Sequence, residues 1–156
     1  MPRGFKNVRF AGSNVNTYHL LDNCYYCSIA ALLGASVEEF FKQVEIMQER
    51  GGASPEATRA LFREAGGNDI ACAAFTDPQD AYDFIKAFPD EESVGLAYYR
   101  VDGSGHMIVA TRDNGYINNW VNQGIKCVDY QQEPPRVAGF PPEPTIVHYV
   151  VFYRRS

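Results

Sequence analysis

Positive charge is scarce in this sequence and nowhere concentrated. Lysine and arginine number 14 against 19 aspartates and glutamates, which gives a net charge of −5 at pH 7. The densest basic stretch is only the pair Arg154-Arg155. Near the N-terminus, Arg3, Lys6 and Arg9 are spread out and add little. Because nucleic-acid-binding domains usually carry a basic patch or stripe, we expect no nucleic-acid partner.

Long apolar stretches are missing as well. Residues 1–10 lack the apolar run of a cleavable signal peptide. No other segment approaches the ~20 consecutive apolar residues that a membrane-spanning helix needs. We therefore expect no membrane span, and a protein that is cytoplasmic in its producer or exported by a route that leaves no cleavable signal.

Cysteine occurs four times, at a spacing that suggests neither disulfides nor a metal site. Cys24 and Cys27 form one Cys-x-x-Cys pair, and no second pair stands at the spacing of a zinc site. Cys72 and Cys127 lie in apolar, strand-like runs, where a free cysteine behaves as a small hydrophobic side chain. We expect Cys72 and Cys127 to be buried free thiols, and we predict no metal ion and no cofactor.

What the sequence does have is enough apolar and aromatic material for one core. Of its 156 residues 46% are hydrophobic, and ten tyrosines and ten phenylalanines are among them. Capping residues, prolines at helix starts and glycines at helix ends predict helices over 24–33, 36–50, 54–66 and 79–88. β-branched and aromatic residues predict strands over 7–10, 69–75, 93–101, 106–112, 125–131 and 146–154. Helices first and strands after indicate a single α+β domain over residues 1–156, in which N-terminal helices pack on a C-terminal antiparallel sheet. The proline-rich segment 133–144 is expected to cross the surface in an extended form.

The run from Asp22 to Gly34 places a cysteine at the start of an apolar helix. It reads Asp-Asn-Cys-Tyr-Tyr-Cys-Ser-Ile-Ala-Ala-Leu-Leu-Gly. Unpaired backbone N–H groups and the positive end of the helix dipole stabilise a thiolate in a first helical turn, and the thiolate is the nucleophilic form. Cys24 is therefore the candidate nucleophile of a cysteine hydrolase. Cys27, one turn further along, is expected to pack in the core and is the alternative nucleophile.

A nucleophilic cysteine needs a base, for which His106 is the candidate. It follows a Gly-Ser-Gly turn and begins a predicted strand, so its side chain can face a helix terminus across a cleft. A tight turn at 113–115 would place Asn122 opposite His106, whereas a longer excursion would place Asp129 there. Because 125–131 is the better strand and an aspartate stabilises an imidazolium more than an asparagine does, we favour Asp129 and keep Asn122 as the alternative.

These motifs resemble the papain-fold toxin family of bacterial polymorphic and effector toxins. The resemblance covers most of the chain in order, with an Asn-Cys pair that opens a helix, a Gly-His that begins a strand and an Asp-x-Gln on the next strand. It implies a papain-like fold with Cys24 as nucleophile, His106 as its base, and Asp129 and Gln131 on the following strand. The long segment 114–124 between the two strands departs from the family pattern.

The tetrahedral oxyanion of such a reaction needs hydrogen-bond donors. The backbone N–H of the nucleophile and one side chain before it are the expected pair. Asn16, His19 and Asn23 are the upstream candidates. We expect Asn23 and Gln131 to contact the oxyanion or the substrate. Trp120, the single tryptophan, lies beside this site in the sequence and can line a substrate groove or the core.

The resemblance also implies a function. Several members of the family resemble effectors that deamidate a glutamine of a host protein, and others in the wider papain-like group are peptidases. We therefore expect a protein glutamine deamidase with a Cys-His-Asp triad, with a cysteine peptidase as the alternative. A protein substrate in a target cell, delivery by a specialised secretion system, and a cognate immunity or chaperone protein as partner are implied in the same way. Two other classes remain open, a non-catalytic binding domain and a dithiol redox protein that uses Cys24 and Cys27.

Overall fold

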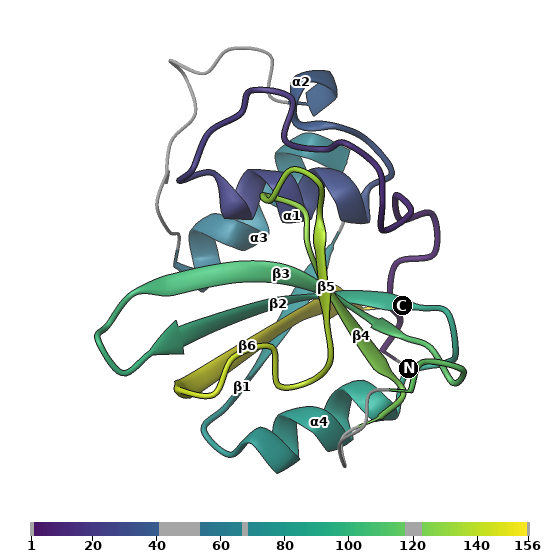
Figure 1. Cartoon of the computed structure of the whole chain (residues 1–156), viewed down its shortest axis with the longest axis vertical. Helices are drawn as coiled ribbons and strands as arrows, with labels where there is room; N and C mark the ends of the chain where they lie inside the picture. The colour runs from purple at the N-terminus through teal and green to yellow at the C-terminus, as the bar shows by residue number, and fades with distance from the viewer. Residues whose placement is uncertain (1, 41–53, 67–68, 118–122, 156) are drawn as a thin grey trace.

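The fold is described from a computed structural model, which covers residues 2–40, 54–66, 69–117 and 123–155. Four helices and six strands occur in these ranges (Figure 1). The helices are α1 (Cys24–Leu32), α2 (Val37–Phe40), α3 (Pro55–Gly66) and α4 (Pro78–Lys86). The strands are β1 (Ile70–Phe75), β2 (Ser93–Arg100), β3 (Gly105–Arg112), β4 (Ile125–Asp129), β5 (Arg136–Ala138) and β6 (Ile146–Arg154).

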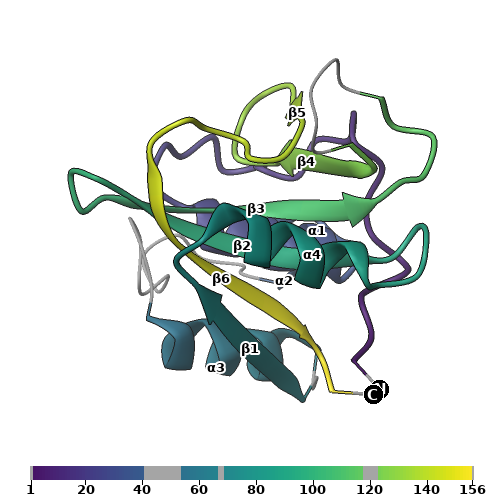
Figure 2. The same cartoon turned by 90° about the horizontal axis from the view of Figure 1, so that it is seen from below.

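The six strands form one antiparallel sheet in the order β1-β6-β2-β3-β4-β5. Helices α1 and α3 cover one face of the sheet, and α4 covers the other (Figures 1 and 2). The buried side chains accordingly form two clusters. The cluster on the α1 side includes Phe62 and Phe152, and the cluster on the α4 side includes Ile85 and Tyr149. The predicted α+β class with an antiparallel sheet is confirmed.

Helix α1 is buried along its whole length, as a helix that is apolar on every side should be. Ser28 donates a hydrogen bond to the carbonyl oxygen of Met107 at 2.8 Å and so fastens the helix to β3. The helix stops before Gly34, whose φ of 81° lies in the left-handed region that favours glycine. A Cβ atom at Gly34 would lie 2.6 Å from the carbonyl oxygen of Asn7. The predicted glycine end of this helix is confirmed.

The other helices begin as their capping patterns predict. At the start of α2, the backbone N–H of Ser36 donates to Glu39 Oε1 at 3.2 Å, which is half of a capping box. The predicted continuation of this helix to residue 50 falls outside the described residues. Helices α3 and α4 start within one residue of their predicted positions. Asp77 caps α4, because its carboxylate accepts the backbone N–H of Gln79 at 2.9 Å.

The long strands follow the prediction closely, and one short strand was not predicted. Strand β6 has the predicted bounds, and β1, β2 and β3 agree with theirs to within one residue. Strand β5 pairs with β4 inside the segment 133–144, for which an extended crossing was expected. Two prolines precede it, and proline is depleted in strands, so the pattern of the sequence concealed it.

The strand predicted over residues 7–10 is wrong. The backbone N–H of Arg9 donates instead to the carbonyl oxygen of Ala31, near the end of α1, at 3.0 Å. The lead-in segment meets the sheet earlier, where Phe5 exchanges two backbone hydrogen bonds with Ser93. Around Arg9 the chain therefore contacts the end of α1, and it joins the sheet only at the earlier residue Phe5.

Two predictions about the remaining cysteines have opposite outcomes. Cys127 is buried as predicted, on a strand inside the sheet. Cys72 is exposed on β1, which is the edge strand of the sheet. Both are free thiols, as are Cys24 and Cys27.

The register between β3 and β4 differs by two residues from the predicted one. Continued to the start of β3, the observed pairing places Gln131 rather than Asp129 directly opposite His106. The register is set where the chain returns to β4, because the backbone N–H of Asp113 donates to the carbonyl oxygen of Gly124 at 2.9 Å. A shift of two residues leaves every side chain on its original face. Asp129 therefore remains on the face of His106, as its diagonal neighbour.

Candidate active site

His106 and Asp129 form a hydrogen-bonded pair between β3 and β4. His106 Nε2 lies 2.8 Å from Asp129 Oδ2, and the two side chains are 12% and 17% exposed. The carboxylate is itself fixed, because Oδ1 accepts the backbone N–H of Gln131 at 3.1 Å. Burial alone would lower the pKa of His106, but hydrogen bonds with Asp129 and Cys24 outweigh burial and raise the pKa to about 9. The imidazole is therefore held as a cation at neutral pH.

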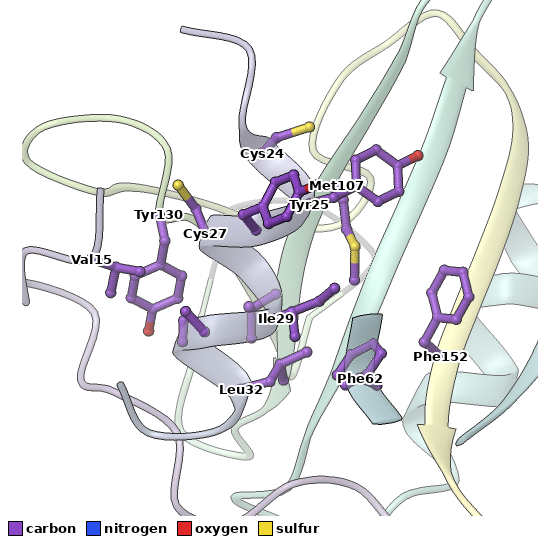
Figure 3. Close-up of a cluster of buried hydrophobic side chains, with 14 of the residues drawn as sticks. Val15, Cys24, Tyr25, Cys27, Ile29, Leu32, Phe62, Met107, Tyr130 and Phe152 are labelled. Atoms are coloured by element: carbon purple, nitrogen blue, oxygen red, sulfur yellow. The ribbon is translucent and has the colours of Figure 1, made fainter. Parts of the chain in front are cut away.

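Cys24 occupies the first position of α1 and is itself buried, at 4% exposed, at the edge of the cleft described below. Figure 3 shows its sulfur beyond the start of the helix, on a different side of α1 from the sulfur of Cys27. The side chain of Cys24 helps to raise the pKa of the His106 imidazole, so the two groups interact. Nε2 of the imidazole is the nitrogen that contacts Asp129. The side chain of Asn23 does not cap the helix, so the first-turn N–H groups are not used up by it.

The three side chains come from opposite sides of the sheet. Cys24 belongs to the cluster on the α1 side, whereas the strand registers put His106 and Asp129 on the α4 side. They meet because His106 is only the second residue of β3, at the strand end that the first turn of α1 reaches. The hydrogen bond from Ser28 to Met107 holds this approach, since Ser28 lies one turn after Cys24 and Met107 follows His106.

A cleft with a volume of about 400 Å³ opens over these side chains. Its size is within the range of sites that hold small molecules or single side chains. Cys24, His106 and Asp129 all line it. Further walls come from the segment before α1, the end of β2, the end of β4 and the proline-rich segment, and they include Leu21, Asp22, Arg100, Gln131, Arg136 and Glu143.

Gln131 brings a hydrogen-bond donor without a partner to this cleft. Its side chain is buried, and Nε2 has no hydrogen-bond partner among the described residues. Its backbone is fixed on both sides, because the N–H donates to Asp129 and the carbonyl accepts from Asn16 Nδ2 at 2.8 Å. A buried donor that lacks a partner costs stability. At a cleft, such a donor is available to negative charge on a bound molecule.

The other predicted donors lie away from the cleft. Asn16 Nδ2 donates to two backbone carbonyls, at 2.7 and 2.8 Å, and Asn23 Nδ2 donates to Asn16 Oδ1 at 2.9 Å. Both amides are buried and neither lines the cleft. His19 is exposed and pairs through Nδ1 with Glu133. Asn23 therefore does not line the cleft, and its amide anchors the lead-in segment to the start of α1.

Cys27 is enclosed in the core, in agreement with the packing role expected for it. It is 0% exposed, and burial raises the pKa of its thiol well above the ordinary value. Figure 3 shows its sulfur on the side of α1 where Val15 and Tyr130 lie. The alternative in which Cys27 is the nucleophile is not favoured by this placement, since Cys27 does not line the cleft. Asn122 and Trp120, the other open alternatives, fall outside the described residues.

Three residues beside His106 were missed from the sequence. Tyr98 packs against its ring, and Arg100 and Glu143 line the cleft. Arg100 is the second-last residue of the strand predicted over 93–101, just before the Gly-Ser-Gly turn, and this position in the sequence could have indicated it. Glu143 lies in the proline-rich segment, where no periodicity indicates which residues return to the sheet.

No family model matches this sequence, and a search of curated proteins finds no match either. Within the described residues, no helix has the length and apolar character to cross a membrane. The same residues contain no group of three His, Cys, Asp or Glu side chains that could hold a metal ion. The arrangement joins a thiol, an imidazolium, a carboxylate and an amide donor at one cleft.

Proposed function

We propose that this protein is a cysteine-dependent amide hydrolase of papain-like fold. Cys24 is the nucleophile, His106 is the general acid and base, and Asp129 orients the imidazole. The observation that carries the proposal is the placement of His106, which is hydrogen-bonded to Asp129 at 2.8 Å and lines the same cleft as Cys24, whose side chain helps to raise the pKa of the imidazole. A thiol, an imidazole and a carboxylate in this order form the arrangement that activates a cysteine for attack.

In the first half of the reaction, Cys24 Sγ attacks the carbonyl carbon of a bound carboxamide. The carbonyl electron pair moves to oxygen, and the resulting oxyanion is stabilised by the backbone N–H of Cys24 and by Gln131 Nε2. The tetrahedral intermediate collapses when the C–N bond breaks. His106 gives its proton to the leaving nitrogen, and a thioester remains on Cys24.

In the second half, water resolves the thioester. The imidazole of His106, now neutral, takes a proton from a water molecule that attacks the thioester carbon. The C–S bond breaks, and a carboxylic acid leaves while the thiolate and the imidazolium are restored. Asp129 keeps its hydrogen bond to Nε2 throughout, so that the other ring nitrogen, Nδ1, transfers the proton in both halves.

The size of the cleft favours a side-chain carboxamide over a backbone amide. About 400 Å³ is enough for one side chain with its neighbouring backbone, and ammonia as leaving group needs no second channel. A peptidase must instead hold a chain on both sides of the bond. We infer glutamine deamidation as the reaction.

The biological setting rests on the resemblance of the Asn-Cys, Gly-His and Asp-x-Gln motifs to papain-fold toxins. It supports an effector that acts on a protein of a target cell. Delivery by a specialised secretion system and a cognate immunity or chaperone protein belong to the same inference.

The test is to incubate the whole chain with denatured casein, a substrate with many accessible glutamines. Released ammonia is measured by a coupled assay, and the products are examined by peptide mass mapping. We expect ammonia release together with glutamine-to-glutamate mass changes in an uncut chain. If new peptide termini appear without ammonia, the reaction is proteolysis rather than deamidation.

The matched controls are the variants Cys24→Ala and Cys27→Ala. Cys24→Ala should abolish both readouts, and Cys27→Ala should keep them. If the wild type and Cys24→Ala behave alike in ammonia release and in mapping, the hydrolase proposal is wrong and the binding-domain alternative stands. If both single variants are inactive while folded, Cys24 is not singled out as the nucleophile and the proposal is wrong.

A further inference from the structure

A tyrosine, an arginine and a glutamate form a closed unit beside His106. Tyr98 Oη donates a hydrogen bond to Glu143 Oε2 at 2.5 Å. Arg100 donates to the same carboxylate with Nε and Nη2, both at 2.7 Å, in the forked geometry that makes such pairs strong. The Arg100 guanidinium also lies 5.5 Å from the centroid of the Tyr98 ring. Each member of the unit therefore contacts the other two.

This unit touches His106 directly through Tyr98. The two residues are cross-strand partners in the pairing of β2 with β3. Their ring centroids are 5.7 Å apart and the planes meet at 73°, which is an edge-to-face contact. Tyr98 is almost fully buried, so its ring is a fixed wall for the imidazole.

A second connection runs through the turn that delivers the histidine. Arg100 Nη1 donates to Ser104 Oγ at 3.2 Å, and its backbone N–H donates to the carbonyl oxygen of Ser104 at 2.8 Å. Ser104 lies two residues before His106. Arg100 thus ties Glu143, on the proline-rich segment, to the turn from which His106 begins β3.

The backbone next to the unit is irregular in a way that suits this role. The pairing of β2 with β6 shifts between Tyr99 and Arg100, since Tyr99 faces His148 whereas Arg100 faces Ile146. Such β-bulges re-aim side chains and are common next to active sites. Here the shift occurs at the residue that holds Glu143.

The charges of the unit also act on the imidazole. The hydrogen bonds that Arg100 donates lower the pKa of Glu143 to about 2, so this carboxylate stays ionised in any ordinary buffer. The positive charge of His106 contributes to the same lowering, and the attraction is mutual. The titratable or charged groups around His106 are Cys24 on α1, Tyr98 and Arg100 on β2, Asp129 on β4, and Glu143 on the proline-rich segment, with Asp22 and Arg136 further along the cleft.

We propose that Glu143 is a positioning residue for His106, acting through Tyr98 and Arg100. It holds the imidazole edge against Tyr98, fixes the turn that precedes the histidine, and favours the protonated ring. The role rests on the proposed function in one respect, because the ring is held for the benefit of Cys24.

The first experiment follows the histidines of the full-length chain by NMR over a pH series. The chain has only three, so the His106 signals can be assigned with a His106→Gln variant. Glu143→Gln removes a negative charge and leaves Arg100 unneutralised, and both changes disfavour the imidazolium. We expect the pKa of His106 to fall by about half a unit to one unit in Glu143→Gln. A smaller fall is expected in Tyr98→Phe, which keeps the ring and loses one hydrogen bond.

The second experiment needs no substrate. The rate at which iodoacetamide alkylates Cys24 at pH 9 is measured by mass mapping of the peptides, with exposed Cys72 as the internal reference. The pKa of His106 is about 9, so a fall of half a unit to one unit leaves about two- to fivefold less imidazolium at this pH, and alkylation of Cys24 should slow by up to that factor in Glu143→Gln. Because no amide is hydrolysed in this measurement, it tests Glu143 even if every proposed substrate fails.

The matched control is Glu92→Gln. Glu92 also accepts hydrogen bonds from an arginine, Arg3, but it lies just before the opposite end of β2. This variant should lower the Tm and leave both the His106 titration and Cys24 alkylation unchanged. If Tyr98→Phe and Glu143→Gln are folded and also leave both readouts at wild-type values, Glu143 is only a surface tether and the proposal is overturned. If Glu92→Gln moves the two readouts as far as Glu143→Gln does, the effect is general destabilisation and the proposal is equally overturned.

Discussion

Cys24 and Cys27 stand one helical turn apart on α1 and face two different surroundings. Cys24 is 4% exposed, lines a polar cleft and helps to raise the pKa of the His106 imidazole. Cys27 is fully buried, and burial raises the pKa of its thiol. Both thiols lie on the same helix, so their backbone surroundings are similar. The side chains around each thiol therefore decide which one can act as a nucleophile.

The largest effect that tests this difference between Cys24 and Cys27 is expected when each sulfur is removed in turn. Cys24→Ala should lower amide hydrolysis by about 10⁴-fold or more, because the described residues that line the cleft include no other thiol and no hydroxyl. Cys27→Ala should keep activity within a few-fold. It should lower the free energy of unfolding by roughly 1–2 kcal/mol, because it leaves a small cavity in the core. Ammonia release and urea unfolding provide the two measurements, and equal loss of activity in both variants would contradict the assignment.

The next largest effect concerns the carboxylate that orients the imidazole of His106. Asp129→Asn keeps the shape of the side chain but removes the charge that supports the ring at Nε2. We expect kcat to fall by about 10³- to 10⁴-fold with a small change in KM. The control Asp113→Asn changes a carboxylate at the far end of β3 and should leave kcat unaltered. A variant at Asp129 with near wild-type kcat would mean that another group holds the histidine.

A smaller effect is expected for the donor of the oxyanion. Gln131→Ala removes Nε2 from the cleft and should lower kcat by about 10²-fold, since one donor is lost in the transition state. Gln132→Ala is the matched neighbour, because Gln132 also lines the cleft but donates only a long 3.4 Å hydrogen bond to Asp129. Comparable losses at both positions would show that the end of β4 matters for binding rather than for the oxyanion.

The smallest expected effect concerns how the free energy of unfolding depends on pH. The pKa of His106 is raised from 6.5 to about 9 in the folded chain, so the folded state holds this proton more tightly than the unfolded state does. The resulting stability is fully present below pH 6.5 and is lost as the pH rises through about 9. We expect a loss on the order of 2–3 kcal/mol across this window in the wild type, and a flatter profile in His106→Gln. Urea unfolding at pH 6, 7.5 and 9 compares the two, and parallel profiles would contradict the raised pKa.

The choice of Asp129 shows how a sequence argument can hold although its geometry is wrong. The predicted pairing set Asp129 directly opposite His106, and the structure shows it two residues away along β4. An error of two residues does not change the face of a strand, and a carboxylate spans the diagonal. An error of one residue would have turned the side chain away. Patterns of alternation therefore predict the face of a site residue better than its exact partner.

Residues that depend on long-range packing were not predictable in this way. Glu143 lies in a segment with five prolines, where neither helical nor strand periodicity shows which side chain returns to the sheet. Asn23 looked like an oxyanion donor because it adjoins Cys24, but its amide is used by Asn16, seven residues earlier. Cys72 looked buried because its strand is apolar, whereas the order of strands leaves β1 at an edge. In each case the missing information was a neighbour that is distant in the sequence or an edge that only the assembled sheet defines.

Asn16 gives the cleft a single point of attachment for three stretches of chain. Its amide bonds to the carbonyl oxygens of Leu20 and Gln131 and to the amide of Asn23. These bonds hold three parts of the chain together. The parts are the loop that carries Leu21 to the rim of the cleft, the start of α1 and the end of β4. In an Asn16→Asp variant, a carboxylate oxygen would replace the donor and repel the carbonyl oxygens of Leu20 and Gln131. We expect this repulsion to separate the three parts of the chain. The shape of the cleft thus depends on a residue that does not line it.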